Sequence, residues 1–258
     1  MKLLLAFISL VVACTNGQRQ NTTPAVPSHI IVNGYAAYEG KAPYIVSLAI
    51  RTDGSNTVAV GDGTIIASNW VITAAHCLTT DYVVIYYGSN WARQGQISHT
   101  VRKENFIRHN LWPGTNGNDI GLIRTPSVSF NNRINKVALP KFSDKNNAMV
   151  NWWTVACGWG GMADGKLADW LQCMDVQIIS NDECGRSYGN LPFGIVCTRD
   201  DNKSACGGDS GGPLVTHDDP RLVGIISVGG VNCKGPTGYT RIVAHLDWIR
   251  EKTGIAYY

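Results

Sequence analysis

Short apolar runs alternate along the chain with clusters of glycine, asparagine and aspartate. The runs cover residues 44–50, 64–66, 70–73, 82–87 and 120–124, then 152–156, 171–179, 213–215 and 222–228. Runs of this length that are rich in β-branched and aromatic residues predict antiparallel strands in barrels or sandwiches. A helical apolar period occurs near the end, in residues 242–252, and Gly254 closes it. The pattern therefore predicts an all-β protein with a C-terminal helix.

The first thirty residues differ from the rest. Lys2 precedes an apolar run at residues 3–13 that is too short to cross a bilayer, which is typical of a secretory signal. Cleavage after Ala13 and cleavage after Gly17 both satisfy the small-residue preference. We predict a signal peptide at 1–17, a polar pro-segment at 18–30 and a main domain at 31–258. With this signal peptide, we expect the protein to be secreted to the extracellular space, which is an oxidising environment.

Composition and charge narrow the function classes. The chain has 28 glycines and only 16% charged residues, which suits a turn-rich β protein. Loss of Lys2 and Arg19 with the leader lowers the formal charge from +3 to +1. No basic stripe or charge run is present, so nucleic acid and anionic membrane are poor partners. A composition change near residues 139–141 suggests a seam between two β halves, near 140.

Three local motifs carry candidate chemistry. The sequence Thr-Ala-Ala-His-Cys ends an apolar strand at residues 73–77 and contains His76. The sequence Asn-Asp-Ile-Gly-Leu places Asp119 just before another apolar strand. The sequence Gly-Gly-Asp-Ser-Gly-Gly-Pro, residues 207–213, sets Ser210 among glycines, where a backbone can approach a substrate closely. These residue types are those of nucleophilic acyl transfer.

Peptide hydrolysis needs a nucleophile, a base that takes its proton and a group that orients the base. A histidine with a pKa near ~6.5 accepts and returns the proton, and a buried carboxylate fixes its tautomer. Taken singly, His76 reads as a structural residue and Asp119 as a turn former. The glycine-rich serine loop is far more specific, and the three motifs in this order favour a catalytic triad of His76, Asp119 and Ser210.

With these motifs, and with Ile-Val-Asn-Gly at 31–34, Gly-Trp-Gly at 158–160 and Trp-Ile at 248–249, the chain resembles the chymotrypsin-like (trypsin-fold) serine proteases. The resemblance runs from Ile31 to Ile255. The segments 38–41, 157–161 and 246–250 look most similar to the insect gut proteases of the Jonah group. The resemblance implies two six-stranded antiparallel β-barrels with the triad in the cleft between them.

The resemblance also assigns roles. Ser210 would be the nucleophile, His76 the general base and then acid, and Asp119 its orienter. The backbone amides of Gly208 and Ser210 would form the oxyanion hole, and Ser227 would bond to the triad aspartate. No cofactor is implied, and residues 89–91 lack the acids of the family's calcium loop, so no metal is expected. The expected partners are polypeptide substrates, an activating protease and protein inhibitors, and the expected state is a monomer.

By resemblance, the substrate pocket is formed by two wall segments and a base. Its residues would be Ser204, Ala205, Ser227, Val228, Gly229 and Thr237. A trypsin needs an aspartate at the base, because a buried basic side chain must find a counter-charge. Ser204 is neutral there, and Thr237 should narrow the interior. We therefore expect chymotrypsin-like cleavage after apolar or aromatic residues.

Activation in this family cuts the chain before an Ile-Val pair, and the new ammonium pairs with the aspartate preceding the nucleophile. Ile31 and Asp209 match these positions, so the protein is expected to be made as a zymogen. Ile30 stands where the family usually has Arg or Lys. An apolar-specific activator, a cut elsewhere and rare activation all remain open. The alternative function is a non-catalytic homologue that binds a partner.

The cysteines are compared with the family's pairs. Cys184 with Cys197, and Cys206 with Cys233, match two of them. The usual partners of Cys77, Cys157 and Cys173 are replaced by other residues, and a Cys157–Cys173 bridge across a hairpin is expected instead. Cys77 would remain a free buried thiol beside His76. Asp62, where a glycine is usual, is a further change near the cleft.

Overall fold

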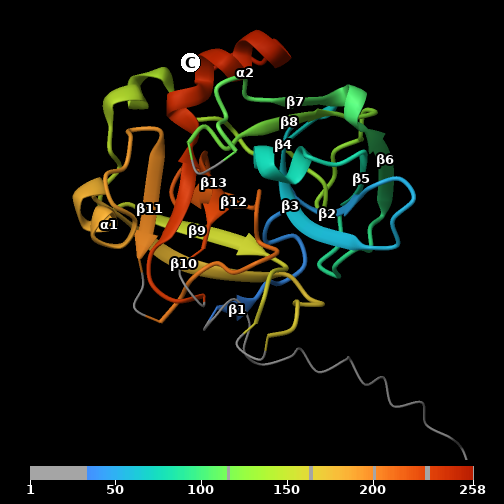
Figure 1. The fold of residues 1–258 in the computed structure, drawn as a ribbon, viewed down its shortest axis with the longest axis horizontal. Coiled ribbons are helices and arrows are strands. Elements are labelled where there is room, and N and C mark those ends of the chain that lie inside the picture. The colour runs from blue at the N-terminus through green and yellow to red at the C-terminus, as the bar shows by residue number, and fades with distance from the viewer. Residues whose placement is uncertain (1–33, 115–116, 163–164, 200–201, 230–232, 258) are drawn as a thin grey trace, which may run out of the picture.

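The computed structural model describes residues 34–114, 117–162, 165–199, 202–229 and 233–257, which form two β-sheets side by side (Figure 1). The N-terminal sheet has the spatial order β6-β5-β2-β3-β4-β8-β7. Its strands are β2 (Ile45–Arg51), β3 (Val58–Ala67), β4 (Trp70–Thr73), β5 (Tyr82–Tyr87), β6 (Ile97–Arg102), β7 (Phe106–Arg108) and β8 (Gly121–Arg124). The strands β6 and β7 stand at opposite ends of this order, yet only the 3-10 turn Lys103–Asn105 separates them. The two edges therefore meet, and the sheet curls into a barrel.

The C-terminal sheet closes through hydrogen bonds. Its order is β1-β10-β11-β14-β13-β12-β9, and β9 also pairs with β10. The strands are β1 (Tyr35–Ala36), β9 (Trp153–Gly158), β10 (Gln172–Ile179), β11 (Ile195–Arg199), β12 (Pro213–Thr216), β13 (Leu222–Val228) and β14 (Thr237–Arg241). Six strands thus form a ring and β1 adds a seventh at the edge of β10. The predicted two-barrel fold is confirmed, with seven strands per sheet where β7 and β1 are counted separately.

Two short helices complete the fold. The predicted C-terminal helix begins as a 3-10 turn, Ile242–His245, and continues as α2 (Leu246–Thr253), which lies at the top of Figure 1. It ends at Gly254, whose φ of 72° is a left-handed conformation that suits glycine. Helix α1 (Asn181–Tyr188) was not predicted. Its sequence signal is Ser180, whose Oγ accepts a hydrogen bond from Glu183 N at 3.1 Å as an N-cap.

Each barrel has its own apolar interior, and a third cluster joins them. Val46, Leu48 and Ile85 belong to the interior of the first barrel, and Met174 and Ile178 to that of the second. The joining cluster takes residues from both barrels, and it is completed by the C-terminal segment. Its members include Ile45, Ile72, Leu122, Cys157, Leu171, Leu222 and Trp248. Burial of each large side chain contributes about 1.5–3 kcal/mol, so this shared core holds the barrels in a fixed relation.

Among the described residues, no helix has the length and apolar character needed to cross a membrane.

Candidate active site

His76 and Asp119 meet because their strands are neighbours. His76 lies in the 3-10 turn Ala75–Leu78 that follows β4, and Asp119 lies just before β8. The strands pair with Thr73 opposite Gly121, so the two residues extend from the same end of the pair. His76 Nδ1 lies 2.7 Å from Asp119 Oδ2, and the backbone N–H of His76 donates to Asp119 Oδ1 at 3.0 Å. The carboxylate therefore holds both the ring and the backbone of the histidine.

Asp119 is in turn held by the second barrel. Its side chain is buried, with 3% exposure. Ser227 in β13 donates from Oγ to Asp119 Oδ2 at 2.7 Å, and Thr240 in β14 donates from Oγ1 to the carbonyl oxygen of Asp119 at 2.8 Å. These hydrogen bonds cross between the barrels, so the orientation of His76 depends on their packing.

The pKa of His76 reflects two opposed effects. Burial by itself lowers the pKa of the ring, because a buried imidazolium loses hydration. The hydrogen bond to Asp119, the adjacent Cys77 and the charge of Asp119 raise it and prevail, so the pKa lies above its ordinary value. The arrangement favours a histidine that accepts a proton readily and keeps one tautomer, with Nδ1 donating to Asp119.

The serine loop packs directly on the strands that carry His76. The carbonyl oxygen of Ser210 accepts a hydrogen bond from Asp62 N at 2.7 Å, and Cys77 Sγ lies 3.8 Å from the same oxygen. A side chain on Gly211, whose φ is 85°, would collide with Thr73 and Asp62. The loop can therefore approach β3 and β4 only with glycine there. The structure thus brings the serine loop to the turn of His76.

The predicted oxyanion-hole segment has the backbone shape that glycine allows. Gly208 has a φ of 100°, and Asp209 N donates to the carbonyl oxygen of Cys206 at 3.1 Å. Asp209 is fully buried, and its carboxylate accepts from Gly160 N at 2.7 Å and from Cys206 N at 2.8 Å. Burial raises the pKa of Asp209 to about 6, against the lowering effect of these two amides. The side chain of Asp209 thus ties the serine loop to the Gly158–Gly160 segment.

Asp62 is the residue that the sequence motifs left without a role. It lies in β3 with 1% exposure, and its Oδ2 accepts from Trp159 N at 3.3 Å. Burial and the neighbouring carboxyl of Asp209 raise its pKa well above the usual range. The sequence signal was a single acid between Gly61 and Gly63 in a buried strand, which has no functional meaning until the strand is placed beside the serine loop.

The base of the predicted pocket is polar but neutral. Ser204 and Thr237 are buried, and their hydroxyl oxygens lie 3.2 Å apart. Thr237 Oγ1 also accepts from Ala205 N at 3.0 Å. The two wall segments lie close together, because a side-chain carbon on Gly229 would come within 2.5 Å of the carbonyl oxygen of Ala205.

The disulfides stiffen this region. The structure joins Cys157 with Cys173, which face each other across β9 and β10, and Cys184 with Cys197. A third bond links Cys206, next to the serine loop, with Cys233 beyond the other pocket wall. Among the described residues Cys77 is the one free cysteine, and it is buried.

Some predicted features lie outside the described residues. The signal peptide, the pro-segment and Ile31 belong to this part, so the pairing of Ile31 with Asp209 stays a prediction. No group of three or more His, Cys, Asp or Glu side chains suitable for a metal ion occurs in the part of the chain that the structure describes.

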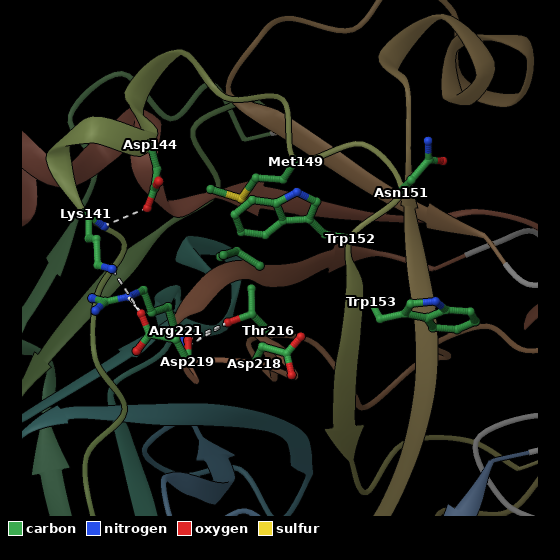
Figure 2. Close-up of a pocket in the computed structure, with 11 residues that line it drawn as sticks. Lys141, Asp144, Met149, Asn151, Trp152, Trp153, Thr216, Asp218, Asp219 and Arg221 are labelled. Atoms are coloured by element: carbon green, nitrogen blue, oxygen red, sulfur yellow. Dashed lines mark hydrogen bonds and ion pairs between the residues drawn. The ribbon is translucent and has the colours of Figure 1, made fainter.

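A surface cavity of about 440 Å³ lies away from these residues (Figure 2). Trp152 and Trp153, at the N-terminal end of β9, are among the residues that line it. Gly158 and Gly160, which approach Asp209, lie at and just beyond the other end of β9. One side of the cavity is charged. There Asp219 forms ion pairs with Lys141 at 3.2 Å and with Arg221 at 2.9 Å. The cavity is therefore separate from the candidate active site.

Comparison with known proteins agrees with this geometry. The family model described as Trypsin matches residues 31–249. Serine protease 1 and Serine protease 2 of Drosophila melanogaster are each 47% identical over 88% of this chain and 87% of their own length. Collagenase of Hypoderma lineatum is 34% identical over all of both chains.

A solved structure shows the same fold. The collagenase structure titled HL collagenase superposes with a TM-score of 0.81, at 34% identity, and covers 88% of this chain and all of that one. The family match spans most of the chain and includes His76, Asp119 and Ser210. The chain therefore belongs to the trypsin family of chymotrypsin-like serine proteases.

Proposed function

We propose that the protein is a secreted serine endopeptidase that cleaves polypeptides through an acyl-enzyme at Ser210. The observation that carries this is the hydrogen bond of His76 Nδ1 to the buried Asp119, which leaves Nε2 as the basic atom of the ring. The serine loop packs against the turn that carries this histidine. No cofactor is needed for this chemistry.

The reaction proceeds in two halves. Ser210 Oγ attacks the substrate carbonyl carbon while His76 Nε2 takes the hydroxyl proton, and the carbonyl oxygen becomes an oxyanion. The backbone N–H groups of Gly208 and Ser210 stabilise this charge; loss of one such donor costs roughly 10²–10³ in rate. The C–N bond then breaks as His76 returns the proton to the leaving amine. Water, deprotonated by His76, hydrolyses the ester and restores Ser210.

Cleavage after apolar or aromatic residues is the proposed specificity. Support comes from Ser204, which is buried, uncharged and bonded to Thr237 at the pocket base. A buried Lys or Arg of the substrate would find no carboxylate at Ser204 and would lose its hydration. Turnover of a panel of peptides that differ only in the residue before the cut tests this, and fastest turnover after Arg or Lys would contradict it.

Activation by cleavage before Ile31 is the proposed switch. The buried carboxylate of Asp209 is the acceptor that the new ammonium requires, and its burial makes an unpaired charge there costly. Sequencing the N-terminus of the active enzyme tests this directly. A start at any residue other than Ile31 would contradict the pairing.

The activity itself is tested with a serine-reactive fluorophosphonate. We expect the cleaved protein to be labelled, and S210A to be unlabelled at equal concentration. The uncleaved precursor should label much more slowly. Absence of labelling in both forms of the natural sequence would favour the alternative, a non-catalytic homologue that binds a partner; retention of all three triad residues argues against it.

A further inference from the structure

Asp62 is a buried acid that the reaction described above does not use. It makes three contacts with the active-site framework. Its backbone N–H donates to Ser210 O at 2.7 Å, its carbonyl oxygen accepts from Thr73 Oγ1 at 2.7 Å, and Oδ2 accepts from Trp159 N at 3.3 Å. The hydrogen bond from Trp159 N is long, at 3.3 Å. It therefore compensates little for the hydration that the carboxylate loses on burial.

The carboxyl of Asp209 approaches the same place from the serine loop. A side-chain carbon on Gly158 would lie 2.6 Å from Asp62 Oδ2 and would collide with Asp209 Oδ1. The two oxygens therefore lie within about 5 Å of each other, a separation at which like charges repel strongly in a buried site. Gly158 leaves the space that the two carboxyls share.

The surroundings of the pair set its protonation. The titratable groups that face Asp62 are Asp209 and, from the turn that carries His76, Cys77. Burial raises the pKa of both acids, to about 6 for Asp209 and well above the usual range for Asp62. Two acids that interact this closely titrate as one unit. Ionisation of one acid therefore opposes ionisation of the other, and burial favours a state of the uncleaved chain in which the two carboxyls share one proton.

We propose that Asp62 is a positioning residue that acts with Asp209 as a two-carboxyl acceptor for the ammonium of the cleaved chain and extends activity to higher pH. The proposal rests on the proposed pairing of Ile31 with Asp209. With one carboxylate, one proton on the pair and the ammonium, the site is neutral overall. As the pH rises, Asp62 releases its proton to water, and two carboxylates then hold the ammonium.

The consequence is a change in the alkaline limit of activity. A free α-amino group has a pKa of roughly 7.7–8.0 and a nearby carboxylate favours its charged form by about 1–3 pKa units. A second carboxylate adds to this effect once Asp62, whose pKa lies well above the usual range, has ionised. When the ammonium loses its charge, the Asp209 carboxylate has no counter-charge and the oxyanion loop is disrupted. A second carboxylate delays the loss of the ammonium charge to higher pH.

The experiment compares pH profiles of kcat/KM for the cleaved natural enzyme with D62N and D62S. We expect both variants to keep activity near neutral pH within a few-fold and to lose it about one pH unit earlier on the alkaline side. The acidic side, which reports on His76, should not move. The control D53N changes an exposed acid of the same barrel, with 57% side-chain exposure, and should leave the whole profile unchanged.

A second measurement does not depend on activity. In the uncleaved precursor the raised pKa values mean that the protonated pair stabilises the fold, and that this stability is lost as pH rises through about 6 and beyond. The melting temperature of the natural precursor should therefore fall more steeply from pH 5 to pH 8 than that of D62N or D62S. This holds even where a variant has low activity.

The outcomes separate the two proposals. D209N should be nearly inactive at every pH; full activity in D209N would overturn the pairing with Ile31 and leave the zymogen proposal wrong. Inactive D209N together with an unshifted alkaline side in both D62N and D62S would overturn the role of Asp62 alone. Equal slopes of melting temperature against pH in the natural and variant precursors would contradict the shared proton.

Discussion

Ser227 donates a hydrogen bond to the same oxygen of Asp119 that binds His76, Oδ2, and both distances are 2.7 Å. Ser227 belongs to β13 of the second barrel, and Asp119 precedes β8 of the first. The bond therefore makes the orientation of the histidine depend on contact between the barrels. A hydrogen bond to a charged group contributes about 1.5–3 kcal/mol, so we expect loss of this bond to lower the rate of the reaction.

We predict that S227A lowers kcat about tenfold while the protein stays folded, because Asp119 keeps its bonds to His76 but loses the partner that fixes the carboxylate plane. D119N should lower kcat by about 10⁴, since an amide favours the wrong tautomer. Steady-state kinetics on one peptide checks both. Equal effects of the two variants would contradict the supporting role given to Ser227.

The raised pKa of His76 predicts the acidic side of the pH profile. A general base must be neutral, so kcat/KM should rise with pH through the pKa of the free enzyme, with its midpoint above the ordinary value of about 6.5 for histidine. In D119N the hydrogen bond from His76 Nδ1 to the carboxylate is lost while burial remains, and the midpoint of the residual activity should move to lower pH. A midpoint that stays in place would show that Asp119 does not control the ring.

A charge at the pocket base should change specificity. S204D places a carboxylate beside Thr237, where a substrate Arg or Lys can pair with it. We expect kcat/KM after Arg to rise at least tenfold and kcat/KM after Phe or Leu to fall by a similar factor. S204A, which adds no charge, is the control and should keep the apolar preference. Unchanged ranking in S204D would mean that Ser204 does not form the base.

Gly160 should tolerate no side chain. A carbon added there would lie 2.5 Å from Asp209 Oδ2 and 2.6 Å from Oδ1, so G160A must displace the carboxylate. We predict loss of at least 10²-fold in kcat/KM, because the oxyanion loop moves with Asp209. The control G185A lies in α1, where an added carbon meets nothing within 4 Å, and should be as active as the natural enzyme.

The Cys157–Cys173 bond closes a short loop between β9 and β10, with a sequence separation of 16. Replacement of both cysteines by serine should lower the free energy of unfolding by about 3 kcal/mol, the chain-entropy value for a loop of this size. Urea unfolding of the mature enzyme checks this.

Cys77 is buried, so a thiol reagent should modify it only after unfolding. Rapid modification in the native state would contradict its placement.

Much of the fold and of the site follows from local patterns. Alternating β-rich runs predicted antiparallel strands, and the resemblance to the serine proteases implied that they form two barrels. The apolar period of residues 242–252 predicted the C-terminal helix within a turn. The motifs around His76, Asp119 and Ser210 stood out because glycine-flanked serine has few ordinary structural uses. The Cys157–Cys173 pairing also matched the structure, since the hairpin places β9 and β10 side by side. Helix α1 was missed because its apolar content is low and only its N-cap marks it.

What the sequence determined alone is the identity and order of these groups: the strands, the histidine His76, the aspartate Asp119 and the nucleophile Ser210. What only the tertiary structure decided is their meeting across the barrels, where Ser227 reaches Asp119 and where Asp62 comes beside Asp209. The physical reason is that a β-barrel is closed by contacts between residues far apart in the chain, and neither periodicity nor spacing records which faces meet. The single acid in β3 acquired chemical meaning only when the serine loop was packed upon it.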